Sequence, residues 1–202
     1  EFRRVLFRSK EGEDKRYKLI LKKDREAGRF AQAALTRVWL MQAVLLFMVS
    51  SPAQVGILAS GAPAPIPPLA WAGFALWCVG VFFEWVGDWQ LTRFKADPAN
   101  HGKVLDTGLW RYTRHPNYFG EVSLWTGQFV LATTALANAG TFYPTWAVGL
   151  AALSPLLEYG LIRFISGVPL LEQSTEKKHK DNPQWKKYKN EVPCFVPFVG
   201  SK

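Results

Sequence analysis

Long apolar stretches alternate along this chain with short segments that carry nearly all of its charge. Lysine and arginine are absent from residues 38–92 and again from residues 115–162. A helix needs about 20 predominantly apolar residues to cross the hydrocarbon core of a bilayer. The pattern therefore predicts an all-α, polytopic membrane helical bundle with about four transmembrane helices, a basic loop and an amphipathic C-terminal tail. The predicted spans are Val38–Val55, Leu69–Leu91, Asn117–Ala137 and Trp146–Ile165.

The distribution of charge also predicts how the chain is oriented in the membrane. Two connections, residues 51–68 and 138–145, contain no charged residue, whereas the N-terminal segment, the central loop and the tail are rich in lysine and arginine. Positively charged segments remain preferentially on the cytoplasmic side. We therefore expect an integral membrane protein with both termini and the central loop cytoplasmic. Its net charge of +9 is then a topology signal, and we expect the lipid bilayer as a partner and no nucleic acid.

The first nine residues, EFRRVLFRS, are set apart from this interpretation. They back-translate into the end of a common sequencing adapter, so we expect residues 1–9 to be an adapter-derived artefact. Residues 10–202 would then be the C-terminal part of a larger membrane domain whose earlier spans are missing.

Cysteine and histidine give no sign of a metal site in the linear sequence. Cys78 lies in a predicted span and Cys194 in the basic tail, where both are expected to be small apolar fillers. The three histidines, His101, His115 and His179, share no spacing that would gather them around an ion. We therefore expect no bound metal and no structural disulfide.

Two pairs of polar residues lie within the predicted spans. Glu84 and Asp88 are four residues apart, as are Asn117 and Glu121, so each pair occupies one face of a helix. Ionisable groups at this depth normally face a bundle interior or a wet cavity and have partners, so the two pairs are expected to face each other. An interhelical hydrogen-bond network without catalysis is the structural alternative. Glu158 is expected to be a lone packing or lumenal residue.

The loop between these pairs supplies cations. It contains Arg93, Lys95, Lys103, Arg111 and Arg114, and the next helix begins at a proline, where free N–H groups and the helix dipole favour anions. The cations can bind phosphates while carboxylates and an amide bind ribose hydroxyls or a carboxamide, which indicates a site for a phosphate-bearing cofactor. The alternative is that the basic residues only set the topology and contact anionic lipids. Trp110 in this loop is expected to be an interfacial anchor.

Three motifs carry a resemblance to a known family. They are FFEWVGDWQLTRFKADPAN, GLWRYTRHPNYFGEVSLWTG, and SGVPLLEQ followed by WKKYKNEVPCFVPF. From about residue 13 to its end, the chain resembles the bacterial membrane proteins of unknown function that are related to the steroid 5-alpha-reductase C-terminal domain. The wider superfamily includes sterol C14-reductases and the isoprenylcysteine and phospholipid methyltransferases, which share an Arg-His-Pro-x-Tyr-x-Gly pattern. The resemblance implies a multi-span helical enzyme of a bacterial inner membrane, with a cofactor cavity open to the cytosol.

The resemblance also implies which residues bind the cofactor, NADPH. Asp88, Lys95, Lys103, Asn117 and Glu121 fall at the family's NADPH-binding positions. Lysine stands where some reductases have arginine, which keeps the charge but loses the planar fork, and Glu84 stands where those enzymes have an asparagine. The motif residues and two residues of the tail complete the implied set: Arg114, His115, Tyr118, Glu172 and Tyr188.

The function implied is hydride transfer from NADPH to a conjugated C=C bond of a steroid-like or other lipid substrate. The catalytic residues that polarise the substrate carbonyl are expected in the missing N-terminal spans, so the chain would hold the cofactor half of the site and be inactive alone. One rival is an S-adenosylmethionine-dependent membrane methyltransferase of the isoprenylcysteine or phospholipid type. Asn117 and Glu121 favour the reductase, because the methyltransferases usually lack that pair. A non-catalytic membrane scaffold is a third alternative.

Overall fold

The computed structural model describes residues 17, 20–58, 65–138 and 145–199, and these residues form helices and connecting turns without a strand. The all-α class predicted from the sequence is confirmed. The chain divides into two compact units between Phe47 and Met48.

The described part of the first unit contains α3 (Lys22–Glu26) and, after a turn at Gly28, a helical run through α4 (Phe30–Ala34), the π-helix η1 (Leu35–Leu40) and α5 (Met41–Val49). The last two residues of α5 already belong to the second unit. The run Phe30–Val49 is long and apolar enough to cross a membrane. Arg37 lies within this run and pairs with Asp24 at 2.6 Å. The buried Asp24 thus supplies a partner for the charge of Arg37, the residue just before the predicted span Val38–Val55.

The predicted first span, Val38–Val55, is therefore wrong in its bounds. The helix begins eight residues earlier, at Phe30, and ends at Val49. A separate helix, α6 (Ser51–Leu58), follows and has Pro52 in its first turn. A proline is tolerated in the first turn, where its missing N–H has no helical partner, but not in a helix interior. This explains why one helix ends and another begins here.

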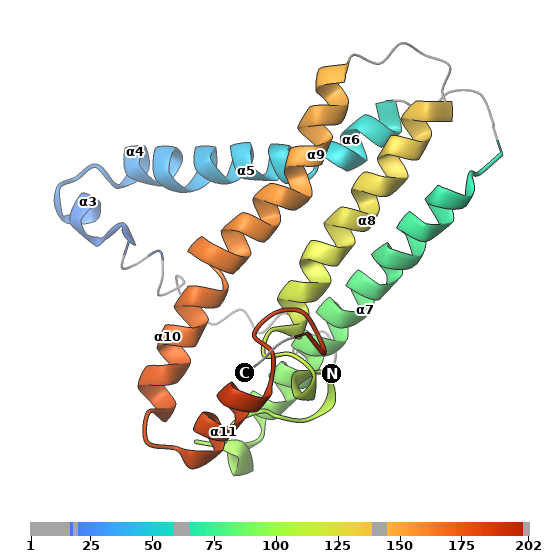
Figure 1. Cartoon of the computed structure of the whole chain (residues 1–202). Coiled ribbons are helices and arrows are strands. Elements are labelled where there is room, and N and C mark those ends of the chain that lie inside the picture. Colours follow the sequence, from blue (N-terminus) through green and yellow to red (C-terminus); the bar gives the residue numbers. More distant parts are fainter. Residues whose placement is uncertain (1–16, 18–19, 59–64, 139–144, 200–202) are drawn as a thin grey trace. The chain divides into compact units, whose positions relative to one another are not determined.

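The second unit is a bundle of antiparallel helices (Figure 1). Its elements after α6 are α7 (Pro68–Ala96), the 3₁₀-helices η2 (Pro98–Asn100) and η3 (Gly108–Arg111), α8 (Pro116–Asn138), α9 (Thr145–Gly160), the π-helix η4 (Leu161–Ile165), α10 (Val168–His179) and α11 (Pro183–Glu191). α8 packs against α6, α7 and α9. The predicted tail is confirmed as two short helices, and α11 buries Trp185 and Tyr188.

Three helical runs in the described part of the chain are long and apolar enough to be membrane spans: Phe30–Val49, Pro68–Ala96 and Trp146–His179. The third predicted span, Asn117–Ala137, forms the 23-residue helix α8 at the predicted place but is not among these candidates. Its polar side chains include Glu121, Ser123, Thr126 and Gln128, each of which is buried or half-buried. The molecule is thus a membrane helical bundle in which α8 carries polar side chains that are partly shielded by the bundle.

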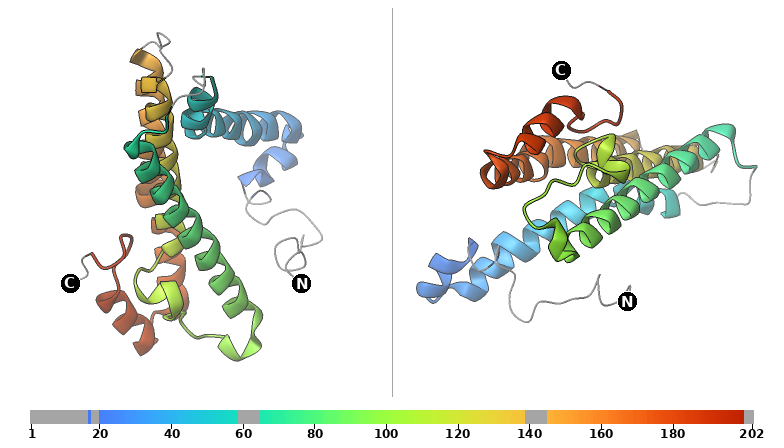
Figure 2. Two further views of the ribbon diagram at one scale, coloured as in Figure 1. Left: turned by 90° about the vertical axis from the view of Figure 1, so that its right-hand side faces the viewer. Right: turned by 90° about the horizontal axis from the view of Figure 1, so that it is seen from below.

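The two longest helices of the bundle, α7 and α8, lie side by side at very short range (Figures 1 and 2). A Cβ atom added to Gly80 would lie 2.7 Å from the carbonyl oxygen of Gly120, and one added to Gly120 would lie 2.6 Å from that of Gly80. Small residues at a helix interface permit this close backbone approach. The contact brings the neighbouring Glu84 and Glu121 together across the interface.

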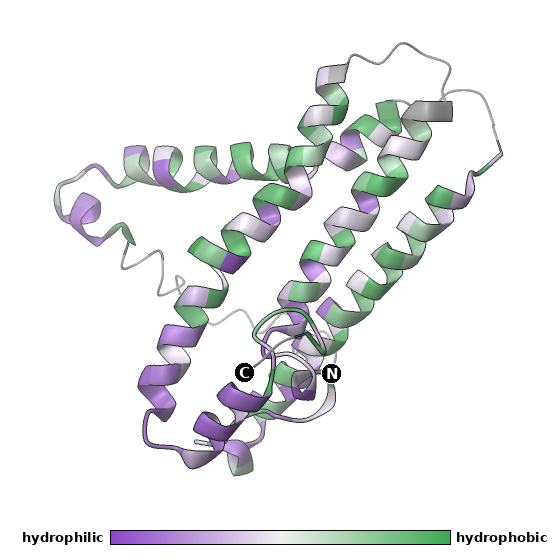
Figure 3. Cartoon of the chain, viewed as in Figure 1, coloured by the Kyte–Doolittle hydropathy of each residue, from purple (hydrophilic) through white to green (hydrophobic). Residues whose placement is uncertain are grey.

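Both polar segments of the second unit lie at one end of the bundle. The loop between α7 and α8 and the helices α10 and α11 form this end, and Figure 3 shows that its residues are hydrophilic while the helices above it are mostly hydrophobic. Hydrogen bonds join the loop to the tail: Asn182 donates to the Gly102 carbonyl and Gln184 to Asp106. The basic loop and the basic tail therefore share one side of the membrane.

Candidate functional site

A cavity of about 420 Å³ lies at the polar end of the bundle. The end of α7, the loop that follows it, α10 and α11 form its walls. Six of the residues that the resemblance assigns to the cofactor line this cavity: Lys95, Lys103, Arg114, His115, Glu172 and Tyr188. Lys95 and Lys103 are exposed, and neither forms an ion pair within the described residues. The cavity thus combines accessible cations with a partly buried polar wall.

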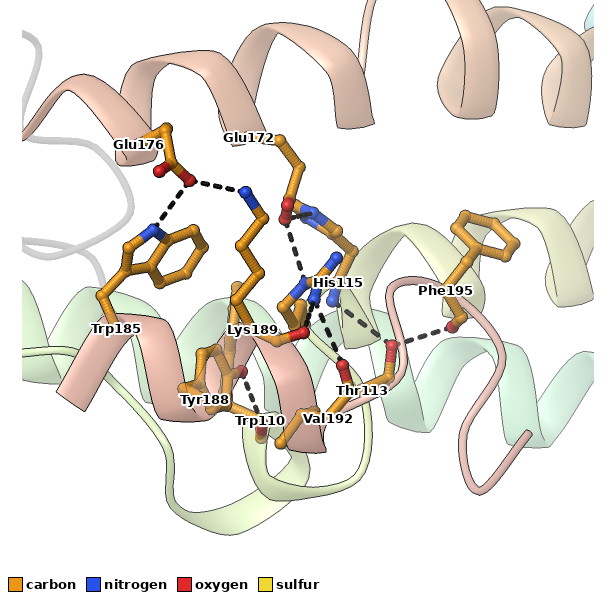
Figure 4. Close-up of polar contacts among 11 residues, drawn as sticks. Trp110, Thr113, His115, Glu172, Glu176, Trp185, Tyr188, Lys189, Val192 and Phe195 are labelled. Carbon is orange, nitrogen blue, oxygen red and sulfur yellow. Dashed lines mark hydrogen bonds and ion pairs between the residues drawn. The ribbon is translucent and has the colours of Figure 1, made fainter. Parts of the chain in front are cut away.

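Arg114 joins the loop to the tail. Its Nε donates to Oε1 of Glu172 at 3.2 Å, and its Nη1 donates to the carbonyl oxygens of Lys189 and Val192. These three partners are labelled in Figure 4. The Arg114 side chain is only 11% exposed, so these bonds are formed largely away from water. Arg114 therefore positions both Glu172 and the end of α11 against the motif.

The backbone beside Arg114 fixes the last part of the chain. The Arg114 N–H donates to the Pro193 carbonyl at 2.9 Å, and the hydroxyl of the fully buried Thr113 donates to the Phe195 carbonyl at 2.8 Å. The residue between these two anchors is Cys194. The tail is thus held on both sides of the cysteine.

His115 is buried and lies between Glu172 and Tyr118. Its Nε2 lies 2.9 Å from Oε1 of Glu172, and its ring stacks on that of Tyr118. Burial lowers the pKa of His115, but its interactions with Cys194 and Glu172 outweigh that effect and hold the pKa above its ordinary value. Its other ring nitrogen, Nδ1, is buried and has no hydrogen-bond partner.

Cys194 completes this group. Burial raises the pKa of its thiol, but hydrogen bonding to His115 and the Arg114 charge lower it more, so the pKa lies below its ordinary value. Three potential metal ligands lie close together here: one atom each of His115, Glu172 and Cys194, all within 4.8 Å of one another. Among the described residues, this is the group that could hold a metal ion. The linear sequence gave no sign of it, because the three residues come from three separate segments.

Tyr188 and Trp110 form the buried floor beside the cavity. The Tyr188 hydroxyl donates to the Trp110 carbonyl at 2.6 Å, and the Trp110 ring N–H donates to the Gly87 carbonyl at 3.0 Å. Burial raises the pKa of the Tyr188 hydroxyl above its ordinary value. The expectation that Trp110 is an interfacial anchor is wrong, since the residue is 8% exposed and ties the loop to α7.

The polar pairs of α7 and α8 face each other, as predicted. The Asn117 amide donates to Oδ1 of Asp88 at 2.9 Å, while the Asn117 carbonyl oxygen is buried without a partner. One turn deeper, Glu84 and Glu121 interact electrostatically. The expectation that Glu158 is a lone residue is wrong: α9 places its buried carboxyl beside that of Glu121. The residues in this polar row are Glu84, Asp88, Asn117, Glu121 and Glu158.

The structure therefore divides the predicted site residues into two neighbouring groups. Six line the cavity, and Glu84, Asp88, Asn117 and Glu121 form the polar row between the helices. Tyr118 belongs to neither and packs on His115. The motif from Arg114 to Asn117 connects the two groups. Of the other two arginines that were expected in the loop, Arg93 lies on α7, over the ring of Trp89, and Arg111 is exposed.

A comparison with known families gives one match over most of the chain. The family described as "Protein of unknown function (DUF1295)" matches residues 2–192. The chain belongs to this family. The match includes most of residues 1–9, whose adapter origin stays a prediction. The resemblance stated from the motifs is confirmed, while a bacterial origin stays a prediction.

Curated relatives of this family member come from two kinds of enzyme. Over 99 residues, 49% of the chain, it is 34% identical to the probable O-methyltransferase ustE of Ustilaginoidea virens, of which it covers 32%. Over 69 residues, 34% of the chain, it is 36% identical to the 3-oxo-5-alpha-steroid 4-dehydrogenase 1 of Mus musculus and to that of Rattus norvegicus, of which it covers 27% and 26%. The chain thus spans about a third or less of the length of these relatives. No solved structure matches.

Proposed function

We propose that this chain holds the cofactor half of an NADPH-dependent membrane reductase that reduces a conjugated C=C bond of a steroid-like or other lipid substrate. The observation that carries the proposal is the adjacency of a cation-lined cavity and a row of carboxylates and an amide. These are complementary to the two ends of a dinucleotide. When bound, NADPH would supply the hydride, and the chain's own residues would bind and orient it. We further propose that this end of the bundle faces the cytoplasm, because it carries the basic loop and tail.

The cavity residues suit the phosphate end of the cofactor. Lys95 and Lys103 are exposed at the cavity, and Arg114 is held in its wall. Each lysine offers a point charge with three donors, and the Arg114 fork is already used by Glu172 and two carbonyls. Lys95 and Lys103 are therefore the residues that would bind phosphate, while Arg114 would mainly fix the wall.

The row between α7 and α8 suits the nicotinamide end. Asn117 donates to Asp88 and has a buried carbonyl oxygen without a partner. A buried acceptor without a donor is costly, and a carboxamide N–H₂ or a ribose hydroxyl would satisfy it. Glu121 lies one turn further along the same face of α8 and can accept a second bond. The residues present therefore fit the group.

The rival function is methyl transfer from S-adenosylmethionine. It is supported by the match to an O-methyltransferase, which covers more of the chain than the match to the steroid dehydrogenases. S-adenosylmethionine has no phosphate, so its single carboxylate would be the only anionic group available to the two lysines of the cavity. A lipid-like substrate is proposed under either chemistry, since the bundle lies in the bilayer.

In a binding assay on the purified protein in detergent, NADPH is expected to bind more tightly than NADH, because Lys95 and Lys103 offer charge for the 2′-phosphate. The preference should shrink in Lys103→Ala and at high salt, since exposed charges are screened over about 10 Å at 0.1 M ionic strength. Lys187→Ala removes the same charge from α11 outside the cavity lining and should leave the preference intact. Tight binding of S-adenosylmethionine with no response to NADPH would favour the methyltransferase instead.

Glu121→Gln is expected to weaken NADPH binding about ten- to a hundredfold. Losing a hydrogen bond to a charged group costs about 1.5–3 kcal/mol, and each 1.4 kcal/mol is about tenfold in affinity. Folded yield in detergent should change little, because glutamine keeps the shape and removes one of several neighbouring carboxyls. The control is Glu191→Gln, at the exposed end of α11. Unchanged affinity with lowered thermal stability would instead indicate a purely structural polar row.

A further inference from the structure

Three segments that are far apart in the sequence bring a nitrogen, a sulfur and an oxygen ligand together at the polar end of the bundle. His115 precedes α8, Glu172 lies on α10 and Cys194 follows α11. Their ligand atoms lie within 4.8 Å of one another. In a tetrahedral zinc site, ligand atoms are roughly 3.4–3.6 Å apart, given bond lengths of about 2.0–2.3 Å. Small side-chain movements of the half-buried Glu172 and Cys194 would close the group around an ion.

The backbone holds Cys194 in place for this role. The carbonyls on either side of it, those of Pro193 and Phe195, accept hydrogen bonds from Arg114 and Thr113. Thr113 is fully buried, so the anchor is rigid. Cys194 is therefore positioned beside His115 by bonds that do not involve its own thiol, which is a feature of a preorganised ligand.

A second observation comes from His115 itself. The residue is 5% exposed, and its Nδ1 is buried without a hydrogen-bond partner. Buried polar atoms nearly always have partners, so each exception requires an explanation. An ion bound at Nδ1 would satisfy this nitrogen directly.

The local charges are compatible with a cation despite the neighbouring Arg114. That guanidinium binds Oε1 of Glu172, and no hydrogen bond to Oε2 is formed among the described residues. A thiolate and a carboxylate beside one arginine leave a net negative charge. Thiolate and imidazole ligands favour Zn²⁺ over the harder Mg²⁺ and Ca²⁺, which prefer oxygen.

We propose that His115, Glu172 and Cys194 form a binding site for Zn²⁺ with a fourth position open to the cavity. His115 and Glu172 line that cavity, so a water molecule or an anionic ligand in the cavity could take the open position, as in zinc sites with three protein ligands. The inference does not depend on the identity of the cofactor.

The test is a metal-binding assay on the whole chain in detergent, without any nucleotide. After treatment with a chelator, the protein is dialysed against Zn²⁺ and its metal content measured; one ion per chain is expected. With Co²⁺ in place of Zn²⁺, a thiolate-to-cobalt charge-transfer band should appear in the near ultraviolet. Cys194→Ser should abolish the band and weaken Zn²⁺ binding by at least about tenfold, the lower limit typical of lost outer-shell partners.

Controls separate this site from other causes of metal binding. The chain has two cysteines, and Cys78→Ser should keep the cobalt band, because Cys78 is an exposed residue of α7. Glu172→Gln provides a second ligand variant should Cys194→Ser fail to fold. In the wild-type chain, Zn²⁺ should also slow maleimide labelling of Cys194 but not of Cys78. Substoichiometric Zn²⁺ in the wild-type protein, or a cobalt spectrum without a thiolate band, would overturn the proposal.

Discussion

Gly120→Leu is expected to destabilise the bundle by about 3 kcal/mol, at the upper end of the usual cost of overpacking. At this position even a Cβ would lie 2.6 Å from the Gly80 carbonyl oxygen. The atoms in its way belong to the backbone of α7, so no side-chain rotation can relieve the clash, and the helices must separate. NADPH affinity should fall with stability, because separation would move Glu84 away from Glu121. Unfolding of the purified protein by titration with a denaturing detergent measures the first effect.

Gly149→Leu is the matched control. Gly149 lies in α9, and a Cβ there would meet nothing within 4 Å. The same substitution should therefore change stability by no more than about 0.5 kcal/mol, as is usual for surface positions. Equal losses in the two variants would mean that leucine is harmful at any helical glycine, and the close contact of α7 with α8 would lose its assigned role.

The close contact of α7 with α8 at Gly80 and Gly120 is a feature that the pattern of apolar residues does not predict. Gly73, Gly80 and Gly87 are seven residues apart on α7, and Gly120 and Gly127 repeat this spacing on α8. This seven-residue repeat is visible in the sequence and is typical of small residues along one helix face. The prediction of spans from hydropathy did not use it, because hydropathy measures how apolar a segment is and not which face contacts a neighbour.

Helix ends were predicted well where a local signal sets them. α8 begins at Pro116, where a proline is favoured at the first helical position. The predicted end of a helix was wrong where the first charged residues after an apolar stretch were taken to mark that end. α7 was expected to end at Leu91, yet it continues to Ala96 and ends before Asp97, the residue that precedes Pro98. Helical conformation is disfavoured for the residue before a proline. The helix is therefore ended by Pro98 and not by the point at which the sequence becomes polar.

The site was predictable in part for the same reason. Asp88 and Asn117 were expected to meet because each lies on a defined helix face near the same loop, and their hydrogen bond confirms it. The positions of Glu158 and Cys194 could not be derived in this way. Glu158 reaches Glu121 through the packing of α9 on α8, and Cys194 reaches His115 through bonds made by its neighbours. Contacts of this kind depend on the whole fold and leave no periodic pattern.

Arg114→Met is expected to lower stability by about 3 kcal/mol and to release the C-terminal segment. Arg114 donates to Glu172 and to the carbonyls of Lys189 and Val192, and its side chain is 11% exposed. Breaking a buried ion pair by removing one partner typically costs about 3–5 kcal/mol, because the other charge is left without compensation. The present pair is partly buried, so the lower value applies. Trypsin should then cleave after Lys186 and Lys187 faster than in the wild-type protein.

The control for this prediction is Arg111→Met. Arg111 belongs to the same loop and is exposed, so its removal changes the net charge equally without touching the tail. Its stability and its trypsin cleavage should match the wild type, because surface substitutions rarely exceed about 0.5 kcal/mol. If both arginine variants released the tail to the same extent, general loss of positive charge would be the cause. If neither did, the side-chain bonds of Arg114 would not be what holds Glu172 and the end of α11 in place, and the tail would be held by the buried Trp185 and Tyr188 of α11.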